Sequence, residues 1–153
     1  MGKQMNVRAI ENGTVIDHIP ADCLFKIINI LDLEHETHQI LFGTNLESKR
    51  MGTKAIIKIT DRYCADDEIN RISIVAPMIC VNTIKNFQVV EKRQVEVPTQ
   101  VEGFVKCGNP RCITNHEKIK TRFLVQRDDV GDLKLRCVYC EKSTSQHEMV
   151  IIK

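Results

Sequence analysis

Two pairs of cysteines in the last third of the chain constrain its fold more than any other feature. Cys107 and Cys112 are separated by four residues, Cys137 and Cys140 by two, and 24 residues lie between the pairs. Each pair forms a short loop that can present two thiolates to one ion, and four such ligands match structural Zn²⁺. The alternative is two disulfides or merely buried thiols. The odd total of seven cysteines argues against a disulfide framework, so we predict one closed zinc site.

The sequence shows no sign of secretion or membrane insertion. No segment approaches the ~20 apolar residues that a membrane helix requires, and residues 1–10 lack the apolar core of a secretion signal. We therefore expect no membrane partner and a cytoplasmic location, in which thiols stay reduced.

The charge is too evenly balanced for a typical nucleic-acid-binding protein. Residues 1–100 carry 12 Lys and Arg against 13 Asp and Glu, and residues 101–153 carry 10 against 7. Four thiolates and one Zn²⁺ would reduce the net charge of the second segment to about +1. A zinc ribbon that binds nucleic acid normally has a dense basic face. We expect no nucleic-acid partner, and a steep salt dependence of DNA or RNA binding would favour that alternative.

The first part of the chain, residues 1–97, alternates between strand and helix patterns. Apolar residues recur at every second position in 5–9 and 53–60, and at helical spacing in 24–31 and 69–76. Residues 15–19 continue as a further extended run. Further short strands are expected at 39–42, 79–84 and 87–90, the last two joined at Lys85-Asn86. The order strand, helix, strand, strand, helix, strand predicts an α+β domain of the ferredoxin-like, split β-α-β type.

Residues 98–153 are expected to form a second, smaller domain. The boundary is placed beside Pro98, which lies between two apolar patterns. About 50 residues bury little core, and domains of that size often need a metal or disulfide staple. Strands near 101–105, 121–125, 132–136 and 148–152 would form a small antiparallel sheet with both cysteine loops at one end.

The cysteine site is predicted to be structural. A catalytic zinc keeps one position open for water, whereas four cysteines close the shell. His116 and His147 are weaker candidate ligands. A thioredoxin-like role for Cys137 and Cys140 lacks the strand-to-helix context that such a role requires. The sequence contains no phosphate-binding glycine loop or nucleophile elbow, so we expect no enzymatic activity.

Charged residues in the first part could form a polar pocket. Asp17 and His18 end one strand, Lys54 and Lys58 share a face of another, and Lys92 ends a third. Lysine ammonium groups neutralise phosphates as mobile point charges. The alternative is that these are ordinary surface charges, which is the commoner situation for such residues.

Several sequence blocks resemble the regulatory chains of aspartate carbamoyltransferase. The resemblance spans nearly the whole chain. It rests on Gly13-Thr14-Val15-Ile16-Asp17-His18-Ile19-Pro20, Ile57-Lys58-Ile59, Ala76-Pro77, Val81-Asn82-Thr83-Ile84, Val89-Val90, Cys107, Asn109, Cys112-Ile113 and Cys137-Val138-Tyr139-Cys140-Glu141-Lys142.

The resemblance implies a non-catalytic subunit that regulates pyrimidine biosynthesis. Its N-terminal domain would bind nucleoside triphosphates, with CTP as inhibitor, ATP as activator and UTP acting together with CTP. Its zinc domain would attach it to the catalytic chain. Regulatory chains would pair as homodimers, and three such dimers would join two catalytic trimers. Nucleotide binding would act by shifting the population between two states of the assembly.

The resemblance also implies particular site residues. His18 and Lys92 would face the phosphates, Lys58 and Asp17 would lie nearer the ribose and base, and Ile10 and Phe87 would frame the base. The full nucleotide site would be Ala9, Ile10, Val15, Asp17, His18, Lys54, Lys58, Asn82, Ile84, Phe87, Val89 and Lys92. The contact with the catalytic chain would include Asn109, Tyr139 and Glu141.

The sequence departs from the best-known members of the family near both sites. Arg8 stands where those members have an acidic residue beside the base, and Phe87 stands where they have tyrosine. Arg111 and Val138 differ from the familiar residues of the cysteine loops. Changes near the base are expected to alter selectivity among nucleotides, whereas loss of a lysine should weaken binding of every triphosphate.

Overall fold

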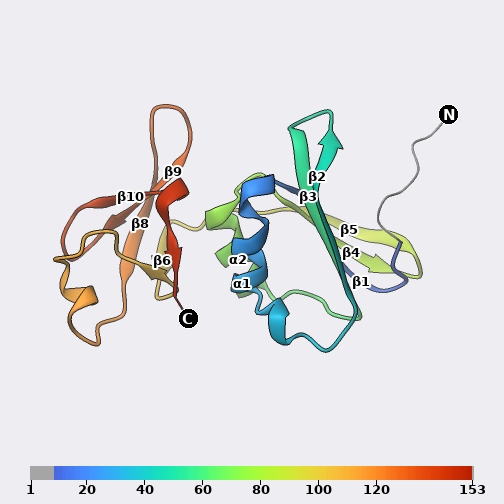
Figure 1. The fold of residues 1–153 in the computed structure, drawn as a ribbon, viewed down its shortest axis with the longest axis horizontal. Coiled ribbons are helices and arrows are strands. Elements are labelled where there is room, and N and C mark those ends of the chain that lie inside the picture. Colours follow the sequence, from blue (N-terminus) through green and yellow to red (C-terminus); the bar gives the residue numbers. More distant parts are fainter. Residues whose placement is uncertain (1–8, 153) are drawn as a thin grey trace. The chain divides into compact units, whose positions relative to one another are not determined.

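The computed structural model describes residues 9–152 (Figure 1). The chain forms two compact units, Met1–Glu96 and Val97–Lys153. The strand expected at 5–9 lies outside the described residues except for Ala9, which belongs to no strand. Within the described part, no helix is long and apolar enough to cross a membrane.

The first unit is a five-stranded antiparallel sheet with two α-helices. Its elements are β1 (Gly13–Ile19), α1 (Leu24–Ile30), β2 (Ile40–Ser48), β3 (Gly52–Thr60), α2 (Asp66–Val75), β4 (Cys80–Lys85) and β5 (Gln88–Gln94). The strand order is β2-β3-β1-β4-β5. Without β5 this is the ferredoxin-like arrangement, which confirms the predicted fold class. β5 extends the sheet beyond β4.

Both helices pack against one face of this sheet, so the other face is left for a site. In β3 the inward side chains Ala55, Ile57 and Ile59 are fully buried, as their alternation predicts. Ile16 and Val81 from the neighbouring strands join the same apolar cluster. The helices contribute Leu24 and Ile27 from α1 and Ile69 and Ile72 from α2.

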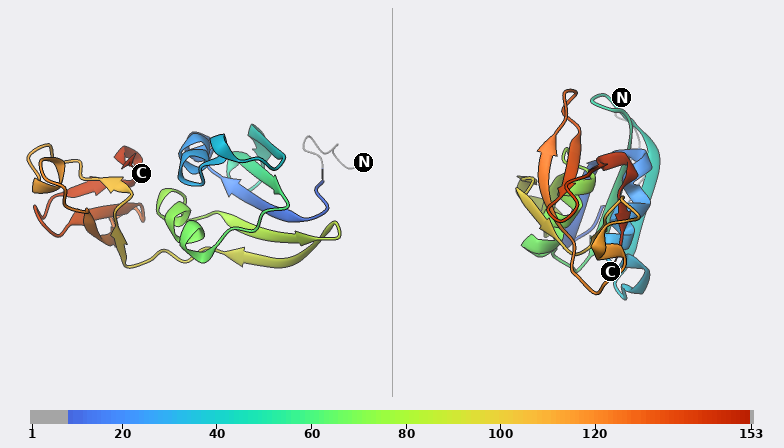
Figure 2. Two further views of the ribbon diagram at one scale, coloured as in Figure 1. Left: turned by 90° about the horizontal axis from the view of Figure 1, so that it is seen from below. Right: turned by 90° about the vertical axis from the view of Figure 1, so that its left-hand side faces the viewer.

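The β4–β5 hairpin differs from its prediction by one residue. The sequence analysis placed the turn at Lys85-Asn86 and began the next strand at Phe87. In the structure Lys85 pairs with Gln88, so the turn residues are Asn86 and Phe87. The tip of this hairpin lies beside the segment that enters β1 (Figure 2).

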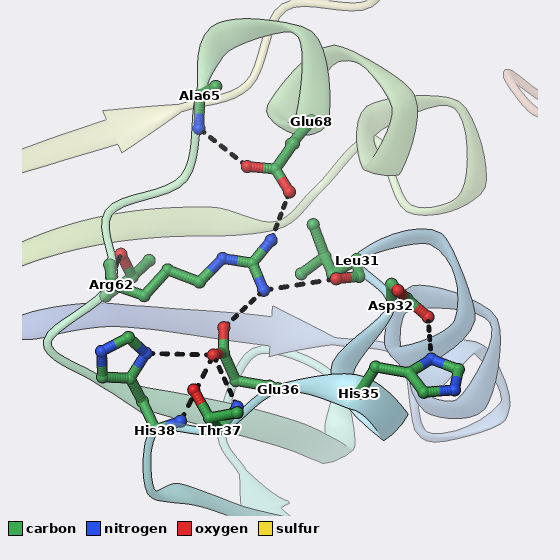
Figure 3. A network of polar contacts seen from close by, with 10 residues as sticks. Leu31, Asp32, His35, Glu36, Thr37, His38, Arg62, Ala65 and Glu68 are labelled. Atoms are coloured by element: carbon green, nitrogen blue, oxygen red, sulfur yellow. Dashed lines mark hydrogen bonds and ion pairs between the residues drawn. The ribbon is translucent and has the colours of Figure 1, made fainter.

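A polar network around Arg62 joins the connections that follow α1 and β3 (Figure 3). The guanidinium donates to the carbonyl of Leu31 at 3.3 Å, to Glu36 at 2.9 Å and to Glu68 in the first turn of α2. Hydrogen bonds from His38, from Arg62 and from the neighbouring backbone lower the pKa of Glu36 to about 2. The network is therefore ionised at neutral pH, and it anchors the segment that leaves β3.

The second unit contains two small antiparallel sheets. Its strands are β6 (Gln100–Glu102), β7 (Val105–Lys106), β8 (Arg122–Arg127), β9 (Leu133–Cys137), β10 (Ser143–Ser145) and β11 (Val150–Ile151). One sheet has the order β10-β9-β8-β6, and the other pairs β11 with β7. The predicted strand at 148–152 was therefore assigned to the wrong sheet, and the fourth strand of the larger sheet is β10.

A bend at Gly103 accounts for this error. Gly103 has a φ of +87°, and its N–H donates to the carbonyl of Thr121 at 2.9 Å. The Thr121 hydroxyl lies 2.6 Å from the carbonyl oxygen of Gly103 and 2.7 Å from that of Val105. These contacts turn the chain out of the larger sheet after β6. β7 then pairs separately, with Ile151 opposite Val105.

Candidate nucleotide site and metal centre

Strand register places four of the predicted nucleotide-site residues in one row across the first sheet. Val15 in β1 pairs with Lys58 in β3 on one side and with Asn82 in β4 on the other. Asn82 in turn pairs with Lys92 in β5. Val15 alternates with the buried Ile16, so the row lies on the face opposite the helices. At ordinary strand spacing it extends about 14 Å.

A second group lies at the end of β1. The pairing of β1 with β3 shifts register between Ile16 and Ile19, and His18 within this bulge has a φ of +60°. Bulges re-aim side chains, and histidine tolerates this conformation better than most residues. Lys54 approaches Asp17 to 2.9 Å, and the His18 N–H donates to Asp17 at 2.6 Å.

His18 has an unused hydrogen-bonding atom. Among residues 9–152, its Nδ1 is the buried side-chain nitrogen or oxygen that lacks a hydrogen-bond partner. Buried polar atoms are rarely left unsatisfied, so such an atom needs an explanation, for example an absent ligand. Nδ1 lies 4.0 Å from the Asp17 carboxylate, which is too far for a hydrogen bond.

Burial and neighbouring charges shift the pKa values of Lys58 and Asp17 on this face. Lys58 is 5% exposed, and burial lowers the pKa of its ammonium, an effect that the nearby Asp17 opposes. Burial raises the pKa of Asp17, but hydrogen bonds from Lys54 and from the His18 backbone outweigh it and leave this pKa below its ordinary value. An anionic ligand near Lys58 would favour the charged form of its ammonium group, as Asp17 does.

The other predicted residues gather near the β4–β5 turn. Ile84 pairs with Gly13 and with Val89, and the Phe87 N–H donates to the Glu11 carbonyl at 2.9 Å. Phe87 is 65% exposed and Val89 is 57% exposed, so both can meet a ligand. Ile10 and Ile84 are buried, and Ala9 is exposed. Arg8 lies outside the described residues.

The four cysteines of the second unit form a compact cluster suited to a metal. Their sulfur atoms all lie within 4.8 Å of one another. The distances from Cys107 to Cys140 and from Cys112 to Cys137 are both 3.7 Å. Sulfur ligands about 2.3 Å from a tetrahedral metal would be about 3.8 Å apart. The residues present therefore fit a closed, structural metal site.

Neither candidate histidine joins this cluster. His116 Nε2 lies 2.8 Å from the carbonyl oxygen of Pro110. His147 Nε2 lies 3.1 Å from the Asp132 carboxylate. Both side chains are exposed, and each is engaged away from the sulfur atoms.

Two residues that the sequence analysis missed support the first cysteine loop. Asn115 donates to the carbonyl oxygens of Cys107 at 3.1 Å and Asn109 at 2.7 Å. The Thr114 hydroxyl donates to the Cys112 sulfur at 3.2 Å. Hydrogen bonds to the ligand residues of a metal site orient these ligands and affect the affinity for the metal. Their signal in the sequence was a hydroxyl and an amide residue two and three positions after the ligand Cys112.

The thiols differ in acidity before a metal binds. Burial raises the pKa of Cys107 to about 12. Burial also opposes ionisation of Cys140, but hydrogen bonds from the Asn109 side chain and the Lys142 backbone outweigh it and bring this pKa to about 7. A bound metal must therefore displace protons from the buried thiols.

The residues predicted to contact a partner lie on the two cysteine loops. Asn109 is partly exposed between the first two ligands, and Tyr139 is 46% exposed between the last two. Glu141 has a φ of +65°, and its exposed carboxylate lies 3.8 Å from Arg136. Exposed apolar side chains of Ile113 and Val138 lie on the same loops.

The first unit therefore presents a polar sheet face, and the second holds four sulfur atoms in an arrangement that suits a metal. Residues 5–96 match the family model for the allosteric domain of the aspartate carbamoyltransferase regulatory chain, and residues 99–150 match the model for its metal binding domain. The chain therefore belongs to the family of aspartate carbamoyltransferase regulatory chains.

Individual relatives agree with this assignment. The regulatory chain from Bacteroides fragilis is 47% identical over 148 residues, which cover 97% of this chain and 95% of that one. That from Porphyromonas gingivalis is 48% identical over 140 residues, covering 92% and 91%. That from Pyrococcus abyssi is 45% identical over 149 residues, covering 96% and 97%. The members of this family are regulatory chains, so the predicted non-catalytic role is confirmed.

Proposed function

We propose that this chain binds nucleoside triphosphates on the free face of its first sheet and thereby controls the catalytic chain of aspartate carbamoyltransferase. The effectors would be CTP, ATP and UTP, acting on pyrimidine biosynthesis. The observation that carries the proposal is the row Lys58, Val15, Asn82 and Lys92, with the unsatisfied His18 beside it. Such a face offers the positive charge of its lysines to phosphate oxygens.

The nucleotide would lie along β1. His18 and Lys92 would contact the phosphates, and Asp17 and Lys58 would lie nearer the ribose and base. The exposed Phe87 ring at the hairpin tip would contact the base. The buried Ile10 and Ile84 would contribute chiefly through main-chain groups.

The metal of the second unit would be Zn²⁺, one per chain. Four thiolates in a tetrahedral arrangement favour zinc or iron–sulfur chemistry, and a single ion without redox function suits a structural site. When bound, the ion would hold the two cysteine loops together. Asn109, Tyr139 and Glu141 on these loops would then meet the catalytic chain, and nucleotide binding would shift the assembly between two states.

A lysine substitution tests the nucleotide site. Lys92→Ala should weaken CTP and ATP alike, by roughly tenfold, because it removes one charge-assisted contact to phosphate. Isothermal titration of the metal-loaded chain measures both affinities. Lys142→Ala removes an exposed lysine from the second unit and serves as the control. Unchanged binding by Lys92→Ala would remove this residue from the site.

The regulatory-chain homodimer would form at β2. β2 and β5 are the outer strands of the sheet, and β5 carries the charged run Glu91, Lys92 and Arg93, which protects an edge from pairing. β2 instead exposes Phe42, which packs edge-on against the exposed Phe25 of α1, with ring centroids 6.5 Å apart. The nine-residue edge strand β2 begins with the apolar run Ile40-Leu41-Phe42, which is suited to pairing with a second copy.

A charge on this edge should disrupt the dimer. Phe42→Glu should weaken self-association at least tenfold, because the interface would bury an unpaired carboxylate. Sedimentation of the isolated chain measures this. Val130→Glu is the control, because Val130 is 82% exposed in the second unit. Equal dimerisation of both variants would place the interface elsewhere.

A further inference from the structure

The hairpin that presents Phe87 has an unfavourable turn sequence. Asn86 and Phe87 have φ values of +53° and +65°, and they connect paired residues Lys85 and Gln88. A two-residue turn with both central φ values positive is type I′. Asparagine suits the first of these positions, and glycine is the usual second residue. A bulky side chain with positive φ persists only where surrounding contacts hold it.

Two contacts hold the turn from the segment that enters β1. The Asn86 N–H donates to the side-chain oxygen of Asn12 at 3.2 Å. The Phe87 N–H donates to the carbonyl of Glu11 at 2.9 Å. Both N–H groups of the turn residues are therefore satisfied by residues far away in the sequence, which fixes the tip against the start of β1.

A third contact comes from the segment that leaves β3. The Tyr63 hydroxyl donates to the carbonyl of Ile84 at 3.3 Å, just before the turn. The Lys85 ammonium lies 5.8 Å from the centre of the Tyr63 ring, within range of a cation–π interaction. Tyr63 thus touches both residues that lead into the turn.

Tyr63 and Asn12 are themselves well anchored. The carbonyl of Arg62 accepts a hydrogen bond from the buried Thr14 at 2.7 Å, and the Arg62 side chain is held by the network of Figure 3. The carbonyl of Asn12 accepts the N–H of Asp61 at 2.9 Å. The supports of the turn are therefore fixed to the rigid part of the first unit.

We infer that Tyr63 and Asn12 are positioning residues for nucleobase recognition, which hold the strained Asn86-Phe87 turn so that the exposed Phe87 ring is ready to stack on the base. The inference rests on the proposed nucleotide site and adds residues that do not touch the nucleotide. A turn whose backbone is fixed in advance loses less conformational freedom on binding, so preorganisation improves affinity. Of the two proposed phosphate contacts, His18 lies at the other end of β1, and Lys92 lies in the β4–β5 ladder opposite Asn82 and not in the turn.

Binding of three ligands to the metal-loaded full chain tests the inference. CTP, ATP and inorganic triphosphate are titrated onto the wild type, Tyr63→Leu and Asn12→Leu. We expect each variant to bind both nucleotides roughly tenfold more weakly, because part of the base–aromatic stacking is lost. Triphosphate affinity should stay within about twofold, since that ligand has no base. An equal loss for all three ligands, or no loss, would overturn the inference.

Conservative variants separate positioning from general destabilisation. Asn12→Asp keeps an acceptor oxygen for the Asn86 N–H and should retain the wild-type ratio of CTP to triphosphate affinity. Tyr63→Phe keeps the ring beside Lys85 and should lose less than Tyr63→Leu. Phe87→Gly should raise the melting temperature, because glycine suits the turn, while weakening both nucleotides. A fall in melting temperature would contradict the turn strain.

The ligand preference of the wild type distinguishes failure of this inference from failure of the proposed base recognition. If the wild type binds triphosphate as tightly as either nucleotide, the proposed recognition of the base at Phe87 is wrong, and the inference is wrong with it. If the wild type prefers nucleotides and the variants keep that preference, only the positioning role is wrong.

Hydrogen exchange tests the support of the turn without any ligand. In the ligand-free variants, the amides of Asn86 and Phe87 should exchange roughly tenfold faster than in the wild type, as expected for local opening. Unchanged exchange would contradict the support that the two residues are inferred to give.

Discussion

Replacing Cys137 with serine should unfold the second unit and abolish its association with the catalytic chain. Cys137 is fully buried and supplies one of four sulfur ligands. Structural zinc contributes roughly 10–16 kcal/mol to the folding of small zinc modules, far more than a core of about 50 residues provides. Zinc content, amide NMR spectra and co-elution with the catalytic chain each report the loss.

Cys80→Ser is a matched control for this substitution. Cys80 is equally buried, at 1% exposure, but it lies in β4 of the first unit and is not part of the sulfur cluster. It should lower the stability of the first unit by about 1–3 kcal/mol, through a buried hydroxyl, and leave zinc and association intact. A Cys137→Ser chain that keeps its zinc and its partner would show that the cluster is not a structural site.

Gly13→Ala should be the most damaging single change in the first unit. Gly13 has a φ of +140°, and a Cβ there would lie 2.0 Å from the carbonyl oxygen of Ile59 in β3. The backbone of β1 or β3 must move, so we expect a loss of about 3 kcal/mol or more in the free energy of unfolding. Because the same ladder sets Val15 opposite Lys58, nucleotide affinity should fall as well. Urea denaturation and titration with CTP measure the two effects.

Gly52→Ala separates crowding from backbone conformation. Gly52 also has a positive φ, +81°, but a Cβ there would meet no atom within 4 Å. Only the conformational cost of about 1 kcal/mol should appear, with nucleotide affinity unchanged. Equal destabilisation by both variants would mean that the close approach of Gly13 to β3 has no energetic consequence.

Periodicity predicted which side chains share a face of the first sheet, but not which residues of different strands lie opposite one another. Alternation in β3 separated Ala55, Ile57 and Ile59 from Lys54 and Lys58. That Lys58 lies opposite Val15, and Lys92 opposite Asn82, depends on register between distant strands, which local patterns do not encode. The family resemblance supplied these residues as a set, and the structure gives a physical reason for their grouping.

Errors occurred where tertiary contacts override local preference. Phe87 is an aromatic residue of the kind common in strands, yet it lies in a turn. Its N–H donates to Glu11 and that of Asn86 donates to Asn12, and these two hydrogen bonds hold the turn. β6 ends before Gly103, where the chain bends at a positive φ and the Thr121 hydroxyl contacts the Gly103 carbonyl oxygen. The clustering of the four cysteines was predictable because their paired spacing favours a shared metal site, whereas the contacts of Asn115 and Tyr63 arise only in the fold.

Steady-state activity of the reconstituted enzyme tests the central claim most directly. Purified catalytic chain is assayed for carbamoyl aspartate formation alone and together with the zinc-loaded regulatory chain, with and without CTP or ATP. We predict that these nucleotides change the activity only when the regulatory chain is present, and that Lys92→Ala reduces their effect at a given concentration. A stable complex whose activity is the same with and without either nucleotide would contradict the account.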